Sequence, residues 1–218
     1  MSVRYNNYVD KVLTCETEYL TDNIEGRYLL KVKLKNNFTD TLTVAMMNPS
    51  KANKEFSDNT VNKVISFVYK MNLREDSLVR NIGFINIVNI FPAYEPKSGN
   101  VRDKLEKIIS KGKLYSMQKR NKIAFDKALS ESQNVVLAWG DVPSKVKTEF
   151  HNHEAIMMYH LLIQHGLVDN TFVFKYKEYE QILTNKKRPR HPSRNTPDSY
   201  IKVNNMKVFR KKLLYIYV

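Results

Sequence analysis

Three short apolar runs, well separated along the chain, constrain the fold more than any other feature of the sequence. They are T-L-T-V-A-M-M at 41–47, F-I-N-I-V-N-I-F at 84–91 and N-V-V-L-A-W at 134–139. Continuous apolar runs of this length are typical of strands that are covered on both faces. The sequence therefore predicts a central sheet that is buried between two other layers.

Helical periodicity fills the intervals around these runs. Apolar residues recur at helix spacing from Val61 to Tyr69, more loosely from Leu114 to Leu129, and again from Ala155 to Leu162. Strand and helix thus alternate, which favours a three-layer α/β/α fold with a mainly parallel central sheet. The 218 residues contain no repeat of fixed period, so we expect a single α/β domain over 1–218.

Two further segments are expected nearer the edges of the sheet. R-Y-L-L-K-V-K-L at 27–34 alternates apolar and polar residues, as an edge strand with one face in water does. T-F-V-F-K-Y at 171–176 is less apolar than the three central runs. We therefore place these two segments toward the outside of the predicted sheet.

Charge and cysteine content narrow the class of protein. The chain has 36 Lys and Arg against 22 Asp and Glu, a formal net charge of +14. Such an excess favours a polyanionic partner, DNA rather than RNA, although a Lys-rich surface that serves only solubility is the alternative. Cys15 is the only cysteine, which excludes an internal disulfide. No apolar stretch has the length of a membrane span or a signal core, so we expect a cytoplasmic protein without a membrane partner.

Cofactor sites are not expected. The 6 glycines form neither G-x-G-x-x-G nor a Walker pattern, so a nucleotide-binding loop is not predicted. His151, His153 and His160 lie near Glu154, but His151 and His153 point to different sides of a helix and no H-E-x-x-H spacing occurs. We therefore predict neither a metal nor any other cofactor.

The predicted strands end in turns that carry polar residues or glycine. Pro49 stops the first run and holds Asn48 in an extended conformation, so that its side chain points outward from the strand end. The other turns contain Asn89, Trp139-Gly140-Asp141 and Arg190-His191-Pro192-Ser193. Ligands of α/β sheets bind beyond the carboxyl ends of the strands. We expect one cleft there, surrounded by Asn48, Asp58, Asn89, Gly140 and His191.

In order and spacing, these motifs resemble the uncharacterised domain-of-unknown-function sixteen-forty-three family of bacteria and phages. The resemblance extends from about residue 27 to 195, and it implies no established activity. It rests on M-M-N-P-S (46–50), S-D-N-T (57–60), V-N-I-F (88–91), V-V-L-A-W-G (135–140) and P-R-H-P-S (189–193). The chain departs from the family pattern at Asn59 and Ser193, and its Lys-rich segment 94–120 looks longer, as an insertion would.

The same motifs more distantly resemble the uracil-DNA glycosylase superfamily. Those enzymes place Asp-Pro or Asn-Pro after the first strand, Asn at the end of the second, Trp-Gly after the third and His-Pro-Ser after the last. Asn48-Pro49, Asn89, Trp139-Gly140 and His191-Pro192-Ser193 follow in that order. The resemblance implies that Asn48 holds the attacking water, Asn89 reads the base edge and His191 hydrogen-bonds the departing base.

Supporting roles follow from the chemistry of such a site. Asn48 can orient water but cannot take its proton, and Asp58 or Asp141 are the nearest carboxylates for that task. A flipped base would stack on an aromatic ring, for which Phe56, Phe91 or Tyr94 are suited. The residues that we assign to the substrate are Pro49, Ser50, Asn89, Phe91, Trp139, Gly140 and Ser193.

Structural roles are the alternative for several of these residues. Asn48 can form an Asx turn, Asp58 can cap the helix that begins near Thr60, and Asn89 can be a satisfied amide of the core. Trp139 can belong to the core, and Gly140 can serve only a tight turn.

A basic loop at 186–194 is the predicted nucleic-acid contact. It carries Lys186, Lys187, Arg188, Arg190 and Arg194, and a second basic group, Arg210-Lys211-Lys212, follows near the C-terminus. The surrounding positive charge lowers the pKa of His191 and favours the neutral imidazole, which can donate to a base.

Three functions fit the sequence. The first is a cofactor-independent, DNA glycosylase-like hydrolase that releases a modified or mispaired base. The second is a catalytically silent module of the same fold that binds DNA or a DNA-bound partner. The third is a hydrolase of free nucleosides or related small molecules.

Overall fold

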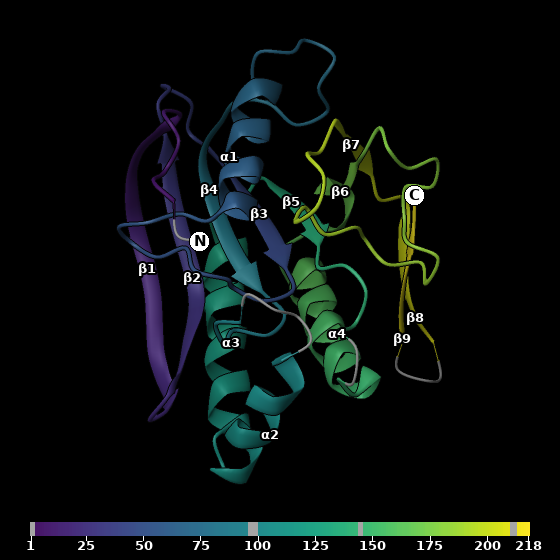
Figure 1. Ribbon diagram of the computed structural model, residues 1–218. Coiled ribbons are helices and arrows are strands. Elements are labelled where there is room, and N and C mark those ends of the chain that lie inside the picture. Colours follow the sequence, from purple (N-terminus) through teal and green to yellow (C-terminus); the bar gives the residue numbers. More distant parts are fainter. Residues whose placement is uncertain (1–2, 96–99, 144–145, 210–212) are drawn as a thin grey trace.

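The computed structural model describes residues 3–95, 100–143, 146–209 and 213–218, which form a mixed α/β fold around one large sheet (Figure 1). In chain order the elements are β1 (Val9–Thr21), β2 (Ile24–Leu34), β3 (Asp40–Met46), α1 (Asn59–Met71), β4 (Ile82–Asn89), α2 (Val101–Ser110), α3 (Leu114–Ser130), β5 (Asn134–Ala138), α4 (Thr148–Gln164), the short 3-10 helix η2 (Val168–Asn170), β6 (Thr171–Lys175), β7 (Ser199–Lys202), β8 (Asn205–Phe209) and β9 (Leu213–Tyr217).

The main sheet has seven strands in the order β1-β2-β4-β3-β5-β6-β7. Its centre is parallel, because β3 pairs in parallel with β4 and β5, and β5 with β6. The flanking strands are antiparallel: β1 to β2, β2 to β4, and β7 to β6. The three runs predicted as buried strands thus form β3, β4 and β5, and the predicted parallel arrangement holds for the centre of a mixed sheet.

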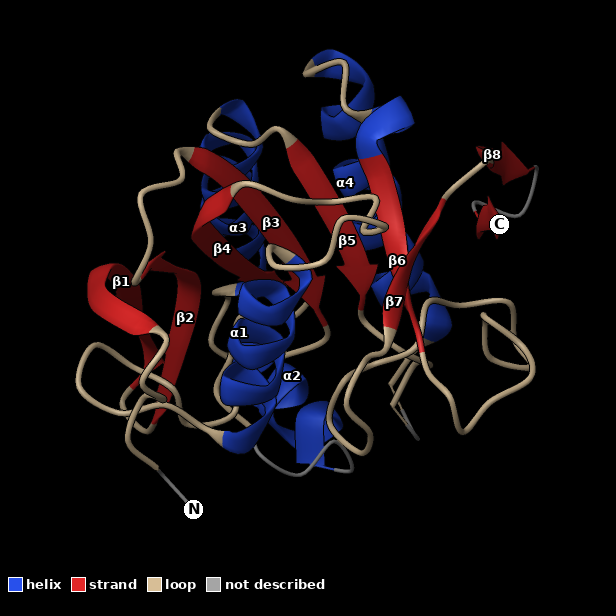
Figure 2. Cartoon of the chain, turned by 90° about the horizontal axis from the view of Figure 1, so that it is seen from above, coloured by secondary structure: helices blue, strands red, loops and turns tan. Residues whose placement is uncertain are grey.

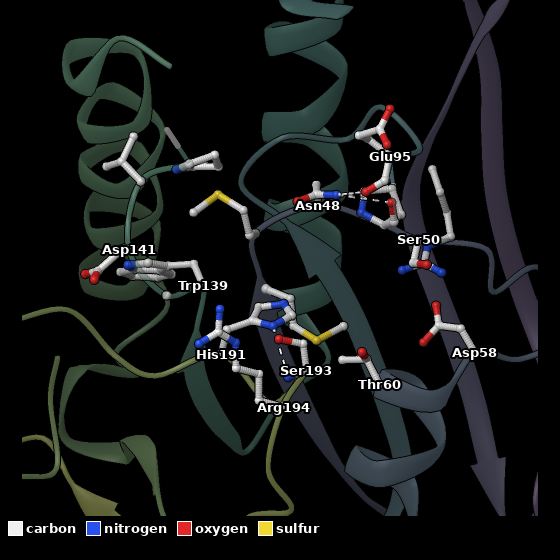
Figure 3. A pocket seen from close by; sticks show the side chains of 17 residues that line it. Asn48, Ser50, Asp58, Thr60, Glu95, Trp139, Asp141, His191, Ser193 and Arg194 are labelled. Carbon is white, nitrogen blue, oxygen red and sulfur yellow. Dashed lines mark hydrogen bonds between the residues drawn. The ribbon is translucent and has the colours of Figure 1, made fainter. Parts of the chain in front are cut away.

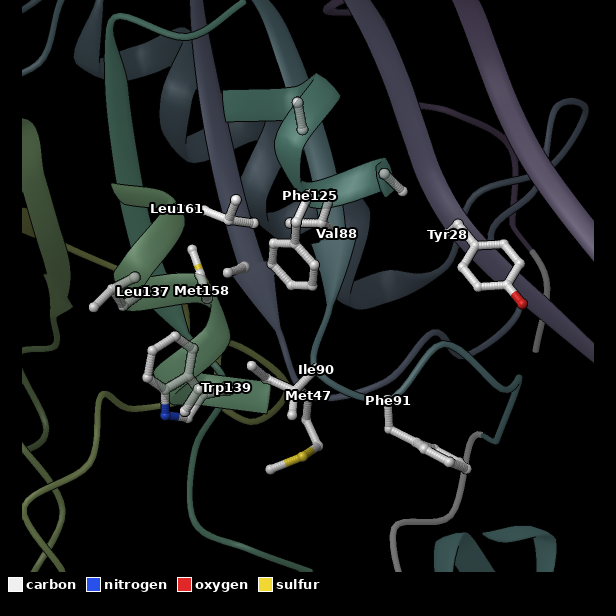
Figure 4. Close-up of a cluster of buried hydrophobic side chains, with 14 of the residues drawn as sticks. Tyr28, Met47, Val88, Ile90, Phe91, Phe125, Leu137, Trp139, Met158 and Leu161 are labelled. Atoms are coloured by element: carbon white, nitrogen blue, oxygen red, sulfur yellow. The ribbon is translucent and has the colours of Figure 1, made fainter. Parts of the chain in front are cut away.

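Helices cover both faces of this sheet. The apolar side of α1, which includes Val64, Ile65 and Val68, packs on one face. Helices α2, α3 and α4 pack on the other face, where Phe125 of α3 and Met158 of α4 join the strand residue Val88 in one cluster (Figure 4). Figure 2 shows α1 on one side of the sheet and α3 and α4 on the opposite side. The architecture therefore has the three layers that the sequence predicts.

The prediction that 27–34 forms an edge strand is wrong. β2 lies inside the sheet, because β1 pairs along it as the outermost strand. The apolar side chains of β2 are buried on both faces, and its polar residues find partners: Lys31 pairs with Glu131 at 2.7 Å. β1 escapes sequence analysis because an edge strand that is half exposed to water carries no apolar run.

The C-terminal part of the chain also contains strands, β7, β8 and β9, that the sequence patterns do not predict. β6 is next to last, beside the short strand β7. β8 and β9 form a separate hairpin. The hairpin contacts α4, because the hydroxyl of Tyr159 in α4 donates a hydrogen bond to the carbonyl of Met206 in β8 at 3.0 Å. The described part of the Lys-rich segment 94–120 consists mainly of α2 and the start of α3, and Arg210-Lys211-Lys212 lies outside the described residues.

None of the helices in the described part of the chain is both long and apolar enough to cross a membrane.

The order of the parallel strands creates a place for a site. From β3 the chain crosses one face through α1 to reach β4, and from β4 it crosses the opposite face through α2 and α3 to reach β5, on the other side of β3. The connection after β5 enters α4, which lies on the same face as α2 and α3. The connections that follow β3 and β5 therefore leave the sheet toward opposite faces. Such a reversal opens a crevice at the carboxyl ends of the two strands.

Candidate functional site

A cleft of about 410 Å³ lies at the carboxyl ends of β3 and β5 (Figure 3). Its walls are the turn after β3, the turn after β5 and the loop around His191, with contributions from β2 and from the start of α1. Ten of the residues predicted for the site line it: Asn48, Pro49, Ser50, Asp58, Trp139, Gly140, Asp141, His191, Ser193 and Arg194. The convergence of strand ends expected from the sequence is therefore present for the first, third and fourth motifs.

The second motif lies deeper than expected. Asn89 ends β4, but the backbone pairing continues past it along β3: the N–H groups of Ile90 and Phe91 donate to the carbonyls of Met46 and Met47 at 2.9 and 2.8 Å. Asn89 is consequently fully buried and Phe91 is a core residue. Neither is among the residues that line the cleft.

The buried side chain of Asn89 is nevertheless unusual. Its Nδ2 and Oδ1 have no hydrogen-bond partner among the described residues, while its backbone carbonyl accepts from Asn121 at 3.1 Å. A buried amide normally has its polar atoms satisfied. The reading of Asn89 as a satisfied core amide therefore does not match the geometry.

His191 occupies the middle of the cleft wall (Figure 3). Its Nδ1 accepts a hydrogen bond from the backbone N–H of Ser193 at 3.2 Å, so the ring proton of the neutral imidazole resides on Nε2. Burial lowers the pKa of His191 to about 4, and the charge of Asp58 opposes this shift only in part. At neutral pH the ring is uncharged and offers one donor, Nε2–H.

Gly140 fixes the position of His191. It has a φ of +76°, which side chains disfavour, and a Cβ placed on it would lie 3.0 Å from Cβ of His191. Its N–H donates to the carbonyl of Pro189 at 2.8 Å. The absence of a side chain at Gly140 is what allows the loop of His191 to rest directly on the end of β5.

Asn48 lines the cleft from the turn after β3. Its Nδ2 donates to the backbone carbonyl of Glu95, and the N–H of Glu95 donates in turn to the carbonyl of Pro49 at 2.9 Å. With the amino group held in this way, Oδ1 of Asn48 takes part in none of the hydrogen bonds found among the described residues. An amide fixed by its donor end and open at its acceptor end can orient a water molecule.

Asp58 is bound into the scaffold. It caps α1, where Oδ1 accepts from the N–H of Val61 at 2.9 Å, and Oδ2 accepts from the N–H groups of Lys51 and Ala52 at 3.3 Å each. The helix-cap reading of Asp58 is thus confirmed. Both oxygens accept hydrogen bonds from the backbone, so this carboxylate is less available to act as a base than the sequence analysis predicts.

Trp139 combines a core position with a place in the cleft. It is 2% exposed and belongs to the apolar cluster under α4, where its ring meets His151 edge on at 6.3 Å. Its Nε1 has no partner among the described residues. The core role predicted as the alternative for Trp139 holds (Figure 4), and the same ring lines the cleft (Figure 3).

The two arginines in the middle of the basic loop face the protein. Arg188 contacts Nδ1 of His151 at 3.0 Å and donates to Oδ1 of Asn152 at 2.9 Å. Arg190 lies 3.8 Å from the ring centre of Tyr179 and donates to two backbone carbonyls. These guanidinium groups hold the loop in place.

The remaining basic residues of this loop are exposed to solvent. Lys186, Lys187 and Arg194 are in this group, and the backbone of the loop is tied to α1 by Lys63, whose Nζ donates to the carbonyls of Ser193 and Arg194 at 3.0 and 2.9 Å. Only these three of the five predicted contacts are free to approach a phosphate without rearrangement.

Arg27 is a cleft residue that sequence analysis missed. It is fully buried, lines the cleft and donates through Nη1 to the carbonyl of Ala52 at 2.7 Å. The signal was a charged residue at the head of an apolar segment, R-Y-L-L. The prediction of an edge strand at 27–34, with one face in water, conceals this signal.

Comparison with known proteins gives one match. The family model described as "Protein of unknown function (DUF1643)" matches residues 27–193, well over half of the chain. No curated protein and no solved structure matches. The matched region contains every cleft residue discussed above except Arg194.

Proposed function

This chain belongs to the DUF1643 family, whose function is unknown, and we propose that it hydrolyses the N-glycosidic bond of a modified or mispaired base in DNA. The observation that carries the proposal is that two groups line one cleft: a neutral His191 that donates through Nε2, and Asn48, whose Oδ1 has no hydrogen-bond partner among the described residues. The three-layer α/β architecture with a parallel centre supports the proposal at the level of fold class.

The chemistry needs these two groups. As the bond between C1′ and the base breaks, the electron pair moves onto the base and positive charge develops on the sugar. A neutral imidazole donor stabilises the negative charge on a base oxygen, and this hydrogen bond strengthens as the bond lengthens. His191 would supply that donor through Nε2–H.

Water attacks at C1′ once the bond has largely broken. Oδ1 of Asn48 accepts one hydrogen of the water and directs its oxygen toward the sugar. The new C1′–O bond forms at a cationic carbon, so the water loses its proton late, to solvent, and a strong base beside it contributes less than in attack on a neutral centre. This accounts for a site in which the carboxylate of Asp58 is engaged by three backbone N–H groups.

Access to the cleft supports a flipped base. A volume of about 410 Å³ falls in the usual range for small-molecule sites. A nucleotide within a duplex reaches such a site only by rotating out of the stack. Trp139 lines the cleft and can contact the base, whereas Asn89, which is buried and does not line the cleft, would have to become accessible before its unsatisfied amide could read the base.

The test is release of free base from DNA. Substrates carry uracil, hydroxymethylated or glycosylated pyrimidines, and genomic DNA of a phage with modified bases completes the panel. We expect free base and alkali-sensitive abasic sites from at least one substrate. Absence of release from all of them, together with normal DNA binding, would reject the hydrolase.

A catalytically silent DNA-binding module is the second candidate. It is favoured by Asp58, because backbone N–H groups hold both oxygens of this candidate base. Asp141, the other candidate base, also lines the cleft and accepts from Oγ1 of Thr184 at 2.7 Å. Hydrolysis of a free nucleoside is the third candidate. It is favoured by the internal contacts of Arg188 and Arg190, which leave fewer cations for a phosphate backbone.

A further inference from the structure

The guanidinium group of Arg27 is the least satisfied charge of the cleft. The side chain is fully buried, and its one hydrogen bond joins Nη1 to the carbonyl of Ala52. Nε and Nη2 have no partner among the described residues. These two atoms form one edge of the guanidinium plane, the fork that binds two oxygens of a carboxylate or phosphate side by side.

Asp58 and Glu95 line the same cleft as Arg27, but neither is paired with that fork. Within the described residues, no carboxylate forms an ion pair with Arg27. Tyr94 lies with its ring centre 5.9 Å from the guanidinium carbon, and Tyr5 and Cys15 are also close enough to feel its charge. Burial raises the pKa of the Cys15 thiol and of both phenols, so these groups are neutral at physiological pH.

Two unsatisfied donors on a buried guanidinium group are costly. Burial of a charged group without a full set of hydrogen bonds lowers stability, and an unsatisfied buried polar group calls for an explanation such as a bound ligand. Arg27 is also one of the residues that line the cleft, so a ligand in the cleft can reach it.

We propose that Arg27 binds an oxyanion, a carboxylate or a phosphate group, carried by the substrate. The inference rests on the proposed function, because it assumes that the cleft takes up a base or nucleotide. It adds the class of substrate: an acidic substituent on the base, or the phosphate of the nucleotide, accepts two hydrogen bonds from Nε and Nη2. The neutral ends of Asn48 and His191 remain for the reacting part of the molecule.

Binding to the full-length protein, measured by calorimetry, tests this assignment without any bond cleavage. The probes are uracil, 5-carboxyuracil, deoxyuridine, deoxyuridine 5′-monophosphate and inorganic phosphate. We expect an acidic probe to bind at least about tenfold more tightly than its neutral counterpart, because the hydrogen bonds are charge-assisted. A preference for 5-carboxyuracil places the oxyanion on the base, and a preference for the monophosphate or for inorganic phosphate places it on the nucleotide backbone.

Two variants connect the preference to Arg27. Arg27→Met keeps the length of the side chain and removes the charge, so it should abolish the preference for the acidic probe. Arg27→Lys keeps the charge but loses the fork, and should retain only part of the preference. The lysine variant also decides the question if the methionine variant does not fold.

Thermal unfolding separates this role from a structural one. If Arg27 acts only through its bond to Ala52, Arg27→Met should lower Tm while the preference for acidic probes, if any, persists, and the assignment is then wrong. Equal binding of acidic and neutral probes by the wild type also overturns it. Release of a neutral base from DNA would in that case still support the hydrolase, whereas tight binding of 5-carboxyuracil without base release from any DNA would contradict the hydrolase and retain Arg27.

Discussion

The imidazole of His191 is the residue on which the proposed chemistry depends most. Its Nδ1 is occupied by the N–H of Ser193, and burial lowers its pKa to about 4, so it donates through Nε2 throughout the physiological pH range. We expect His191→Ala to slow base release by ~10²–10³, the usual loss for one such donor, with little change in DNA affinity.

The control for this variant is His153→Ala, an exposed histidine of α4 outside the cleft, which should release base at the wild-type rate. Asn48→Ala should resemble His191→Ala, and Asn37→Ala on the surface should not. Single-turnover rates and DNA affinities decide the matter. Equal losses of binding and rate in His191→Ala would assign the histidine to binding alone.

A second prediction at the residue scale concerns Gly140. Gly140→Ala adds a Cβ at a φ of +76° and at 3.0 Å from Cβ of His191, whereas Gly112→Ala adds one at a φ of +68° with nothing within 4 Å. Both variants carry the backbone strain, roughly 1–2 kcal/mol. We expect Gly140→Ala alone to lose additional stability in urea unfolding and to lose base release, because His191 has to move. Equal effects of the two substitutions would contradict this role.

At the scale of an element, α4 carries a titratable group whose effect on stability can be isolated. Glu154 is buried, and desolvation raises its pKa from 4.5 to about 7, although Gln118 donates to Oε1 at 2.7 Å. The folded state therefore holds a proton that the unfolded state releases. This contribution to stability is complete below about pH 4.5 and is lost as the pH rises toward about 7.

Glu154→Gln should remove that pH dependence. We expect the variant to gain stability relative to the wild type as the pH rises from 4.5 to 7, by at most about 3 kcal/mol, and the difference to stay constant above that range. Urea unfolding at several pH values measures the difference. His151 and His191, whose pKa values are lowered, shift stability in the opposite direction in both proteins and cancel in the comparison. A difference that does not vary with pH would contradict the prediction.

At the scale of the whole molecule, the net charge of +14 leads to a prediction about salt. If the exposed part of the basic loop contacts phosphates, the logarithm of DNA affinity should fall linearly with the logarithm of salt concentration, by ~0.9 per phosphate. Lys186→Ala and Arg194→Ala should each reduce this slope by about one contact.

Arg188→Ala is the internal comparison for these two variants. Arg188 contacts His151 and Asn152, so Arg188→Ala should lower the melting temperature and leave the salt dependence of DNA affinity nearly unchanged. Fluorescence anisotropy over a range of salt concentrations, with a melting curve for each variant, distinguishes the two effects. An affinity for DNA that does not depend on salt would favour a small-molecule substrate.

Much of this architecture could be predicted from local sequence patterns. The apolar runs at β3, β4 and β5 and the helical spacing between them were sufficient to predict the layers, because a segment covered on both faces needs apolar residues at every position. The antiparallel strands β1 and β7, by contrast, are polar and half exposed, and nothing local distinguishes them from loops.

The sequence by itself determined which residues end the buried strands, and so placed Asn48 and Gly140 at one edge of the sheet, which His191 reaches from the loop between β6 and β7. Only the tertiary structure decided which side chains are free there. Arg27 became a buried cation because β1 covers its strand, Asn89 became enclosed because strand pairing continues past it, and Arg188 turned inward to meet α4. The burial and the hydrogen-bond partners of a side chain depend on contacts between segments far apart in the chain, so a local sequence pattern cannot predict them.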